Sequence, residues 1–270
     1  MAIPKKIHYI WIGNSPMSKL HRDCMETWQK CCPDYEIIGW NESNYDMTKN
    51  PLIVNAVAAK NWALATDYMR VDILNQHGGV YLDTDVELVK SFDDLLCYRF
   101  FVGYEDRHWL SNAIVASEPN NPLLYEIMEI YMQDPRVLKY SNLVSVFSFS
   151  TVFREYYGIS NNGKTVFDGD NFALLSKDYF YAQDWISQKT KLTKNTICIH
   201  RGNKSWFNRS QIAGIKVLNL LRRIVGRRTI DFFKGFVVRK IFRICKKRIW
   251  LNKGLSVQST KKKTKKFVGH

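Results

Sequence analysis

A glycine pair between a helical pattern and an apolar run constrains this 270-residue chain more than any other feature. Residues 63–77 carry apolar side chains at helical spacing, which predicts a helix with one buried face. Gly78 and Gly79 favour a left-handed end to that helix. Residues 80–82, Val-Tyr-Leu, have the β-branched, aromatic and apolar character of a buried strand. The sequence therefore predicts a helix that passes directly into a strand.

Two aspartates separated by one residue follow this strand in the sequence GGVYLDTD. Residues i and i+2 of a strand face the same way, so we expect the side chains of Asp83 and Asp85 to converge at the strand end. Two carboxylates with no basic residue between them repel each other unless a cation lies between them. Their hard oxygen ligands favour Mg²⁺ or Mn²⁺, which commonly also bind the phosphates of a substrate.

The first 40 residues predict a strand, a helix and a second strand. Residues 7–12 are apolar and aromatic, residues 18–30 have a helical pattern, and residues 35–40 are again strand-like. This order predicts an α/β fold with a mainly parallel sheet. Because ligands of such sheets bind at the carboxyl ends of the strands, the indole of Trp11 is placed to stack on a nucleotide base. Packing in the core is the alternative role for Trp11.

Three features together resemble a known family. They are the strand that bears Trp11, the segment Ala65-x-Asp67-Tyr68-x-Arg70, and the GGVYLDTD sequence. The combination resembles the glycosyltransferases with a DXD sugar-binding motif, a family 32-like group. That group includes bacterial capsule and lipopolysaccharide sugar transferases and yeast-type initiating mannosyltransferases. The resemblance implies a GT-A-type nucleotide-sugar-binding fold and transfer of a hexose, with retention of configuration, from a UDP-sugar or related donor.

The resemblance also implies roles for the acidic and basic residues of the central stretch. Asp85, assisted by Asp83, would hold a divalent ion that neutralises the departing diphosphate. Asp67 would accept hydrogen bonds from the hydroxyls of the donor sugar, and the Arg70 fork would donate to hydroxyl or phosphate oxygens. An internal ion pair between Asp67 and Arg70 on a solvated helix remains the alternative.

A second candidate segment is HRGNKSWF, which follows a predicted strand at residues 196–200. Ser205 and Trp206 offer a hydroxyl and an indole N–H to phosphate oxygens. Related transferases carry a His followed by Ser-Trp near this point, closing over the nucleotide diphosphate, which implies that His200 is a third metal ligand. Many of them have a second His where this chain has Arg201. A surface loop whose Trp fills a groove is the alternative.

Fewer sequence features indicate where an acceptor substrate would bind. Residues 100–104 predict a strand, and the loop after it lies where an acceptor could reach the donor. Glu105, Asp106 and Asn112 are the polar candidates there, with an ordinary solvated loop as the alternative. The resemblance implies a glycan or lipid-linked acceptor in surface polysaccharide synthesis.

The positive charge of the chain is concentrated at its C-terminal end. The formal net charge is +15, and residues 213–270 hold 18 of the 40 Lys and Arg but only one acid, Asp231. The remaining 22 basic and 24 acidic residues give residues 1–212, the expected catalytic domain, a net charge of −2. Apolar and basic residues interleave in residues 213–252, which predicts an amphipathic helical segment lying on an anionic membrane. Residues 253–270 predict a disordered basic tail.

Because of this basic C-terminal region, we expect the protein to be cytoplasmic and peripherally attached to the inner face of the cell membrane. The apolar face of this region favours a membrane over nucleic acid, which any Lys/Arg cluster can also bind. Six cysteines without a C-x-x-C pair are expected to be reduced thiols.

Two other classes of function remain open. One is an Mg²⁺-dependent phosphatase, in which Asp83 is the nucleophile and Asp85 the general acid. That class needs a later Lys and a further acidic pair, for which Asp168 and Asp170 are the candidates. However, its motif usually opens the first strand of its domain, whereas here it follows about eighty residues. The other class is a basic membrane-binding or nucleic-acid-binding protein without catalysis.

Overall fold

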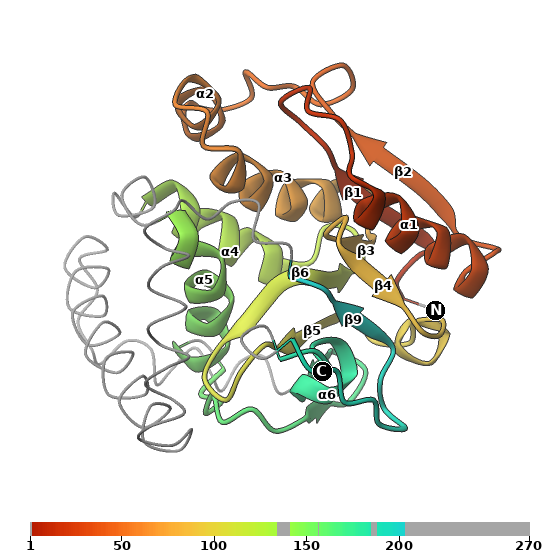
Figure 1. Ribbon diagram of the computed structural model, residues 1–270. Coiled ribbons are helices and arrows are strands. Elements are labelled where there is room, and N and C mark those ends of the chain that lie inside the picture. The colour runs from red at the N-terminus through yellow and green to blue at the C-terminus, as the bar shows by residue number, and fades with distance from the viewer. Residues whose placement is uncertain (1, 134–140, 156, 185–187, 203–270) are drawn as a thin grey trace, which may run out of the picture. The chain divides into compact units, whose positions relative to one another are not determined.

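A computed structural model describes residues 2–133, 141–155, 157–184 and 188–202 of the chain. Within these residues a seven-stranded sheet has the order β2-β1-β3-β6-β5-β8-β7 (Figure 1). The strands are β1 (Lys6–Ile10), β2 (Glu36–Trp40), β3 (Gly79–Leu82), β5 (Phe100–Tyr104), β6 (Leu110–Ser117), β7 (Val166–Asp168) and β8 (Phe172–Leu175). A second sheet pairs β4 (Val86–Leu88) with β9 (Cys198–His200).

The large sheet is mixed, with most strands running one way. β1 is parallel to β2 and β3, and β8 is parallel to β5, while β6 lies antiparallel between β3 and β5. β7 is antiparallel to β8 at the edge. Five strands (β2, β1, β3, β5 and β8) therefore share one direction, and their carboxyl ends lie at one margin of the sheet. The α/β class and the mainly parallel direction predicted from the sequence are confirmed.

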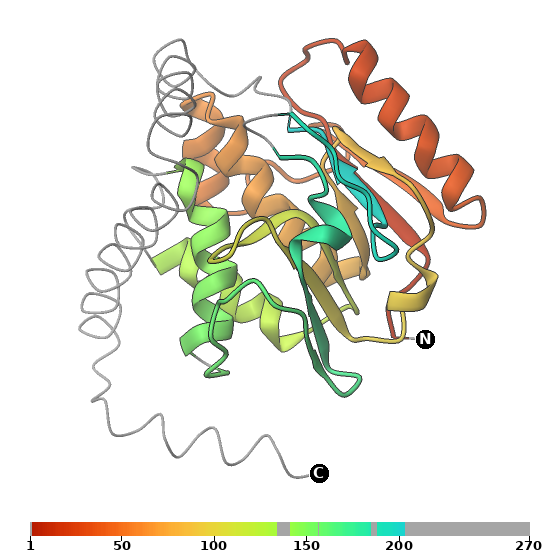
Figure 2. The same cartoon turned by 60° about the horizontal axis from the view of Figure 1, so that its bottom comes forward.

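Helices cover both faces of the sheet (Figures 1 and 2). One face packs against α2 (Pro51–Ala58), α3 (Trp62–His77), α4 (Pro122–Gln133) and α5 (Ser141–Glu155). The other face packs against α1 (Lys19–Cys31), the short helix α6 (Lys177–Phe180), the 3₁₀ turn η1 (Asp93–Leu95) and the small sheet. Alternation along the strands supplies both cores: Phe100 and Val102 of β5 face the first, and Phe101 faces the second.

Helix α3 is buried on all its sides, which differs from the single buried face that its periodicity predicts. All twelve residues from Leu64 to Asn75 are buried. The sequence pattern assigns the polar residues of α3 to a solvent-exposed face, but the structure buries them in polar contacts. Asp72, for example, accepts hydrogen bonds from Tyr45, Gln76 and Lys49.

The glycine pair ends α3 as predicted, although its backbone is more extreme than a left-handed cap. The Gly78 N–H donates to Leu74 O at 2.8 Å, and Gly78 has φ +61° with ψ −171°, a region that is essentially restricted to glycine. A Cβ at position 78 would also lie 2.7 Å from Cδ of Pro119. The chain can therefore reverse from helix to strand here only without a side chain.

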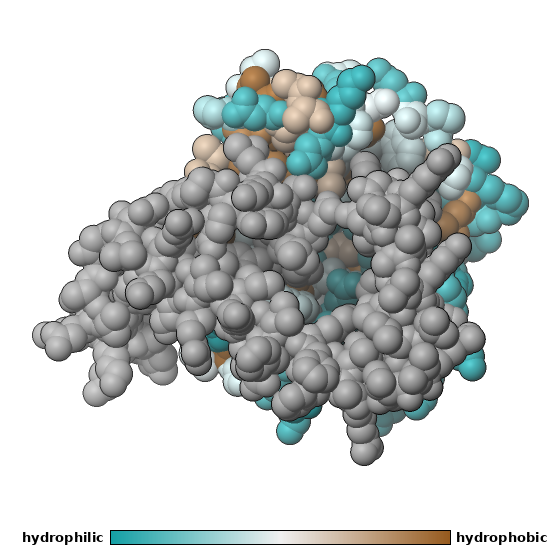
Figure 3. Space-filling view, turned by 60° about the vertical axis from the view of Figure 1, so that its left-hand side comes forward, coloured by the Kyte–Doolittle hydropathy of each residue, from teal (hydrophilic) through white to brown (hydrophobic). Residues whose placement is uncertain are grey.

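Some expectations concern residues that the structure does not describe. Ser205, Trp206 and the segments 213–252 and 253–270 lie outside the described residues. Among the residues that are described, no helix is both long enough and apolar enough to span a bilayer. On the face shown in Figure 3, hydrophilic and hydrophobic side chains are intermixed over the part of the chain that is coloured.

Candidate active site

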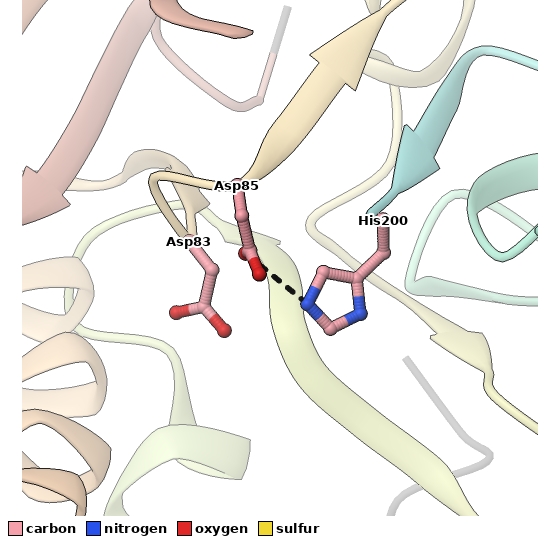
Figure 4. Close-up of side chains that lie close together, drawn as sticks. All are labelled: Asp83, Asp85 and His200. Carbon is pink, nitrogen blue, oxygen red and sulfur yellow. Dashed lines mark ion pairs between the residues drawn. The ribbon is translucent and has the colours of Figure 1, made fainter. Parts of the chain in front are cut away.

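The two aspartates lie in a tight turn between two sheets, not in a strand. β3 ends at Leu82, β4 begins at Val86, and the Val86 N–H donates to Asp83 O at 3.0 Å. This hydrogen bond joins the first and fourth residues of a β-turn. The two carboxylates lie side by side (Figure 4). Their convergence is as predicted, but the turn produces it, so the expectation based on strand alternation was wrong about the cause.

His200 reaches the aspartates because β9 pairs with β4. The pairing is antiparallel and sets Val86 opposite His200. The imidazole Nε2 lies 3.3 Å from Asp85 Oδ1 (Figure 4). One potential ligand atom from each of Asp83, Asp85 and His200 lies within 4.8 Å of the others. Two segments more than a hundred residues apart in sequence thus form one cluster.

The chemistry of this cluster fits a divalent metal ion. Carboxylate oxygens suit Mg²⁺ and Mn²⁺, and an imidazole nitrogen shifts the preference toward the transition metal. Burial and the neighbouring Asp85 carboxylate raise the pKa of Asp83, although Arg70 and His200 oppose this shift. Burial and Asp85 together therefore outweigh the stabilisation of the Asp83 carboxylate by Arg70 and His200.

The negative charges of the same carboxylates also change the pKa of His200. Burial alone would lower the pKa of His200, but the charge and hydrogen bond of Asp85, with smaller contributions from Asp83 and Glu105, raise it to about 9. Without a metal, His200 is therefore an imidazolium at neutral pH and supplies the positive charge that the carboxylates attract.

Arg70 connects this cluster to helix α3. Its Nη1 lies 3.2 Å from Asp83 Oδ1, and its Nη2 lies 3.1 Å from Asp67 Oδ1. The guanidinium also lies over the Tyr81 ring, 4.5 Å from the centroid. The side chains of Arg70 and Asp67 are only 6% and 10% exposed. The alternative of an ion pair on a solvated helix is therefore wrong.

Asn112 belongs to the same network. It is the third residue of β6, and its Nδ2 donates to Asp67 Oδ1 at 2.9 Å, while its backbone oxygen accepts from Arg70 Nη1 at 2.9 Å. The sequence placed Asn112 with the acceptor loop. The structure places its side chain beside Asp67 instead, because β6 starts earlier than the apolar pattern indicated.

The two acidic residues after β5 differ in their surroundings. Asp106 Oδ1 accepts hydrogen bonds from the backbone N–H groups of His108 and Trp109, so its carboxylate shapes its own loop. Glu105 follows a strand that runs in the same direction as β3, and its charge acts on His200. Glu105 therefore lies at the sheet margin that carries the cluster.

Trp11 follows β1, the neighbour of β3, and so lies at the same margin. Its Nε1 donates to Ser15 O at 2.6 Å, and its ring meets the ring of His21 edge-on at 4.9 Å. The indole is half-buried, which keeps part of it accessible to a ligand.

The comparisons with known proteins agree with this geometry. Residues 18–101 match a family described as the glycosyltransferase sugar-binding region containing a DXD motif. This match covers 84 of the 270 residues and shows that this region is similar to the sugar-binding region of that family.

Two curated relatives show how far the similarity extends. An inositol phosphoceramide mannosyltransferase of Schizosaccharomyces pombe is 29% identical over 47% of this chain and 36% of the relative. An uncharacterized glycosyltransferase of Acanthamoeba polyphaga mimivirus is 25% identical over 76% of this chain and 84% of its own length. The chain thus spans about a third of the first relative and most of the second.

A solved structure supports the fold. The PaToxG glycosyltransferase aligns with a TM-score of 0.50 and 20% identity, over 58% of this chain and 71% of that one. The GT-A fold predicted from the sequence is therefore confirmed.

The structure disfavours the phosphatase alternative. Asp168 ends β7, and Asp170 lies in the turn that follows. Because β6, β5 and β8 separate β7 from β3, about 19 Å of sheet lies between those strands at the usual spacing. The acidic pair that the phosphatase mechanism needs is therefore not beside Asp83.

Sequence reasoning missed the contacts of two residues, Tyr81 and Arg201. The Tyr81 hydroxyl donates to Asp83 Oδ1 at 2.9 Å, which a strand period of two could have indicated. Arg201 is also informative: its backbone N–H donates to Asp85 O at 3.0 Å, and its side chain forms an ion pair with Glu87. Arg201 therefore links β9 to β4, and its side chain pairs with the carboxylate of Glu87, which is not part of the cluster.

Proposed function

We propose that this protein is a metal-dependent glycosyltransferase that moves a hexose from a nucleotide-diphosphate sugar, with UDP as the expected nucleotide. The observation that carries the proposal is the convergence of Asp83, Asp85 and His200 beside the buried pair of Asp67 and Arg70. The family match adds a sugar-binding region over residues 18–101. The proposed acceptor is a glycan or a lipid-linked sugar in surface polysaccharide synthesis.

Each side chain has a defined part in this proposal. Asp83, Asp85 and His200 would hold Mn²⁺ or Mg²⁺, which supplies Lewis-acid stabilisation of the leaving diphosphate when bound. Arg70 holds Asp67 and Asp83 in place, and its charge stabilises the negative charge that develops at the junction of sugar and phosphate. Asp67, fixed by Arg70 and Asn112, accepts hydrogen bonds from sugar hydroxyls. Trp11 stacks on the nucleotide base.

Retention of the anomeric configuration is part of the proposal. Attack by the acceptor on the same face, assisted by the leaving phosphate, requires no covalent intermediate on the enzyme. Proton NMR of the first-formed product would show the configuration directly, and an inverted product would contradict retention. Glu105 lies on the proposed acceptor side of this margin.

A thermal-shift panel tests the donor and metal parts of the proposal. UDP-sugars and GDP-sugars are added with Mn²⁺ to the wild-type protein and to Asp85→Asn. The matched control is Asp34→Asn, which removes a carboxylate paired with Lys5 on the surface. We expect a shift specific to one donor in the wild type and in the control and its loss in Asp85→Asn. No shift with any donor would contradict the function.

We also propose that residues 213–252 attach the enzyme to the inner face of the cell membrane. The proposal rests on the 18 basic residues against one acid in residues 213–270 and on the interleaved apolar residues. Each basic residue near an anionic surface contributes about 1 kcal/mol. Sedimentation with phosphatidylserine-containing vesicles, compared with neutral vesicles and with duplex DNA, tests it. Binding to DNA alone would favour the nucleic-acid alternative.

A further inference from the structure

A buried tyrosine lies against the imidazole of His200. Tyr181 directly follows α6 and is 2% exposed, and its ring meets the His200 ring edge-on, with centroids 5.7 Å apart. An antiparallel bridge also pairs Tyr181 with Ile199. Because Ile199 pairs with Glu87 of β4 as well, β9 is held by β4 on one edge and by Tyr181 on the other. The proposed metal ligand therefore has a large buried neighbour.

A glycine of β5 makes room for the Tyr181 ring. A Cβ at position 103 would lie 2.6 Å from Cδ2 of Phe180 and 3.1 Å from Cε2 of Tyr181. Both rings therefore lie directly on the backbone of β5 at Gly103, where a side chain would collide with them. A glycine inside a strand commonly marks such a close approach. The backbone of β5 thus limits how far the Tyr181 ring can move on that side.

The hydroxyl of Tyr181 joins the same ring to β6. It donates to Ser111 O at 3.2 Å, and the backbone oxygen of the next residue, Asn112, accepts from Arg70 Nη1 at 2.9 Å. The pairing of β5 with β6 shifts register just before the pair of Gly103 and Ser111. Such an irregularity disrupts the regular ladder of hydrogen bonds between the strands. Tyr181 and Arg70 are therefore anchored to adjacent residues of β6 at this irregularity.

We propose that Tyr181 is a positioning residue of the metal site: held by β5 and β6, its ring keeps the imidazole of His200 in the orientation in which Nε2 faces Asp85 (Figure 4). The inference deepens the proposed function and rests on it. An imidazole that is already oriented loses less conformational freedom when a metal ion binds. Groups that orient metal ligands commonly change metal affinity by roughly 10–100-fold.

The test measures the affinity of the full chain for Mn²⁺ alone, from the electron paramagnetic resonance of the free ion. We expect the affinity to fall about tenfold in Tyr181→Leu, which lacks the ring, and about threefold in Tyr181→Phe, which keeps the ring without its anchor. Wild-type affinity in either variant would overturn the inference. Denaturant unfolding shows whether each variant is folded, and Tyr181→Phe carries the test if Tyr181→Leu is not.

Tyr45→Leu and Tyr45→Phe are the matched controls. Tyr45 is also buried and donates from its hydroxyl, to Asp72 at 2.9 Å, but it lies in the core on the other face of the sheet. Both controls should bind Mn²⁺ as the wild type does. A loss of affinity in the controls equal to that in the Tyr181 variants would assign the effect to general loosening of the core and overturn the inference.

A double-mutant cycle with His200→Gln shows whether Tyr181 acts through His200. In the His200→Gln background, we expect Tyr181→Leu to weaken Mn²⁺ binding by less than about twofold, because the imidazole that the ring positions is absent. An equal loss in both backgrounds would overturn the inference alone, since the wild type would still bind the metal. A wild-type protein that binds no Mn²⁺ would overturn both this inference and the metal dependence of the proposed function.

Discussion

Arg70 Nη1 lies 3.2 Å from Asp83 Oδ1, which joins a residue in the middle of helix α3 to the turn between the two sheets. Both partners are held on other sides as well, Arg70 by Asp67 and Asp83 by Tyr81. One guanidinium group therefore links helix α3 to the turn that carries Asp83 and Asp85.

Replacing Arg70 with Lys should separate charge from geometry. A Lys keeps the positive charge but lacks the planar fork that contacts Asp67 and Asp83 together. We expect kcat/KM to fall about 100-fold, which corresponds to about 2.7 kcal/mol. The control is Arg99→Lys, whose partner Glu118 is paired on the surface, and it should change stability by less than about 1 kcal/mol. An unchanged kcat/KM in Arg70→Lys would show that the fork has no role in the transition state.

The proposed role of His200 as a third metal ligand can be tested by metal binding alone. We expect His200→Gln to weaken Mn²⁺ affinity at least about tenfold, because it replaces an imidazole ligand with a weakly coordinating amide. His77→Gln is the matched control, since His77 ends α3 near Trp40 and His8 and has no part in the cluster. Titration followed by the electron paramagnetic resonance of free Mn²⁺ gives both affinities. Equal affinities would remove His200 from the ligand set.

The stability of the protein should depend on pH through His8. Burial lowers the pKa of His8 to about 4, and the ring is fixed as a neutral tautomer: Nδ1 accepts from Trp40 and Nε2 donates to Gly78 O. Above about pH 6.5 neither the folded nor the unfolded state protonates His8. As the pH falls from there to about 4, the unfolded state binds a proton that the folded state does not, so about 3 kcal/mol of stability is lost.

Denaturant unfolding at pH 7 and pH 4.5 measures this loss, and His8→Gln provides the comparison because an amide offers one donor and one acceptor without titrating. We expect the wild type to lose more stability than His8→Gln over that interval. The same pH dependence in both proteins would assign the effect to other groups.

At the end of α3, the addition of a single methyl group should have a large effect on stability. We expect Gly78→Ala to lower the free energy of unfolding by about 3 kcal/mol or more, because it combines a backbone conformation restricted to glycine with a contact to Pro119. Gly158→Ala separates the two causes, since Gly158 also has positive φ but a Cβ there would meet nothing within 4 Å. Its expected cost is about 1 kcal/mol. Equal costs for the two variants would mean that the contact with Pro119 relaxes freely.

Local features of the fold could be predicted from the sequence. The strand at residues 100–104 and the start of α4 at Pro122 follow from side-chain period and from proline chemistry. The end of α3 follows from the glycine pair. Each of these depends on interactions between residues close in sequence.

Contacts between distant segments could not be predicted in this way. The antiparallel insertion of β6 between β3 and β5 brings Asn112 to Asp67, and nothing in the local pattern of either segment indicates it. The pairing of β4 with β9 is another contact of this kind. The family resemblance suggested His200 as a site residue, and the hydrogen bonding between the two strands explains its position beside Asp85.

The burial of α3 on every side limits how this protein could evolve. A helix with no solvent-facing residue from Leu64 to Asn75 can accept few substitutions without disturbing the core. A lineage that acquired a new ligand would therefore have to do so through neighbours that α3 contacts, such as residues of α4, α5 and β6. Divergence among related proteins should be found around the helix, with its own sequence nearly constant.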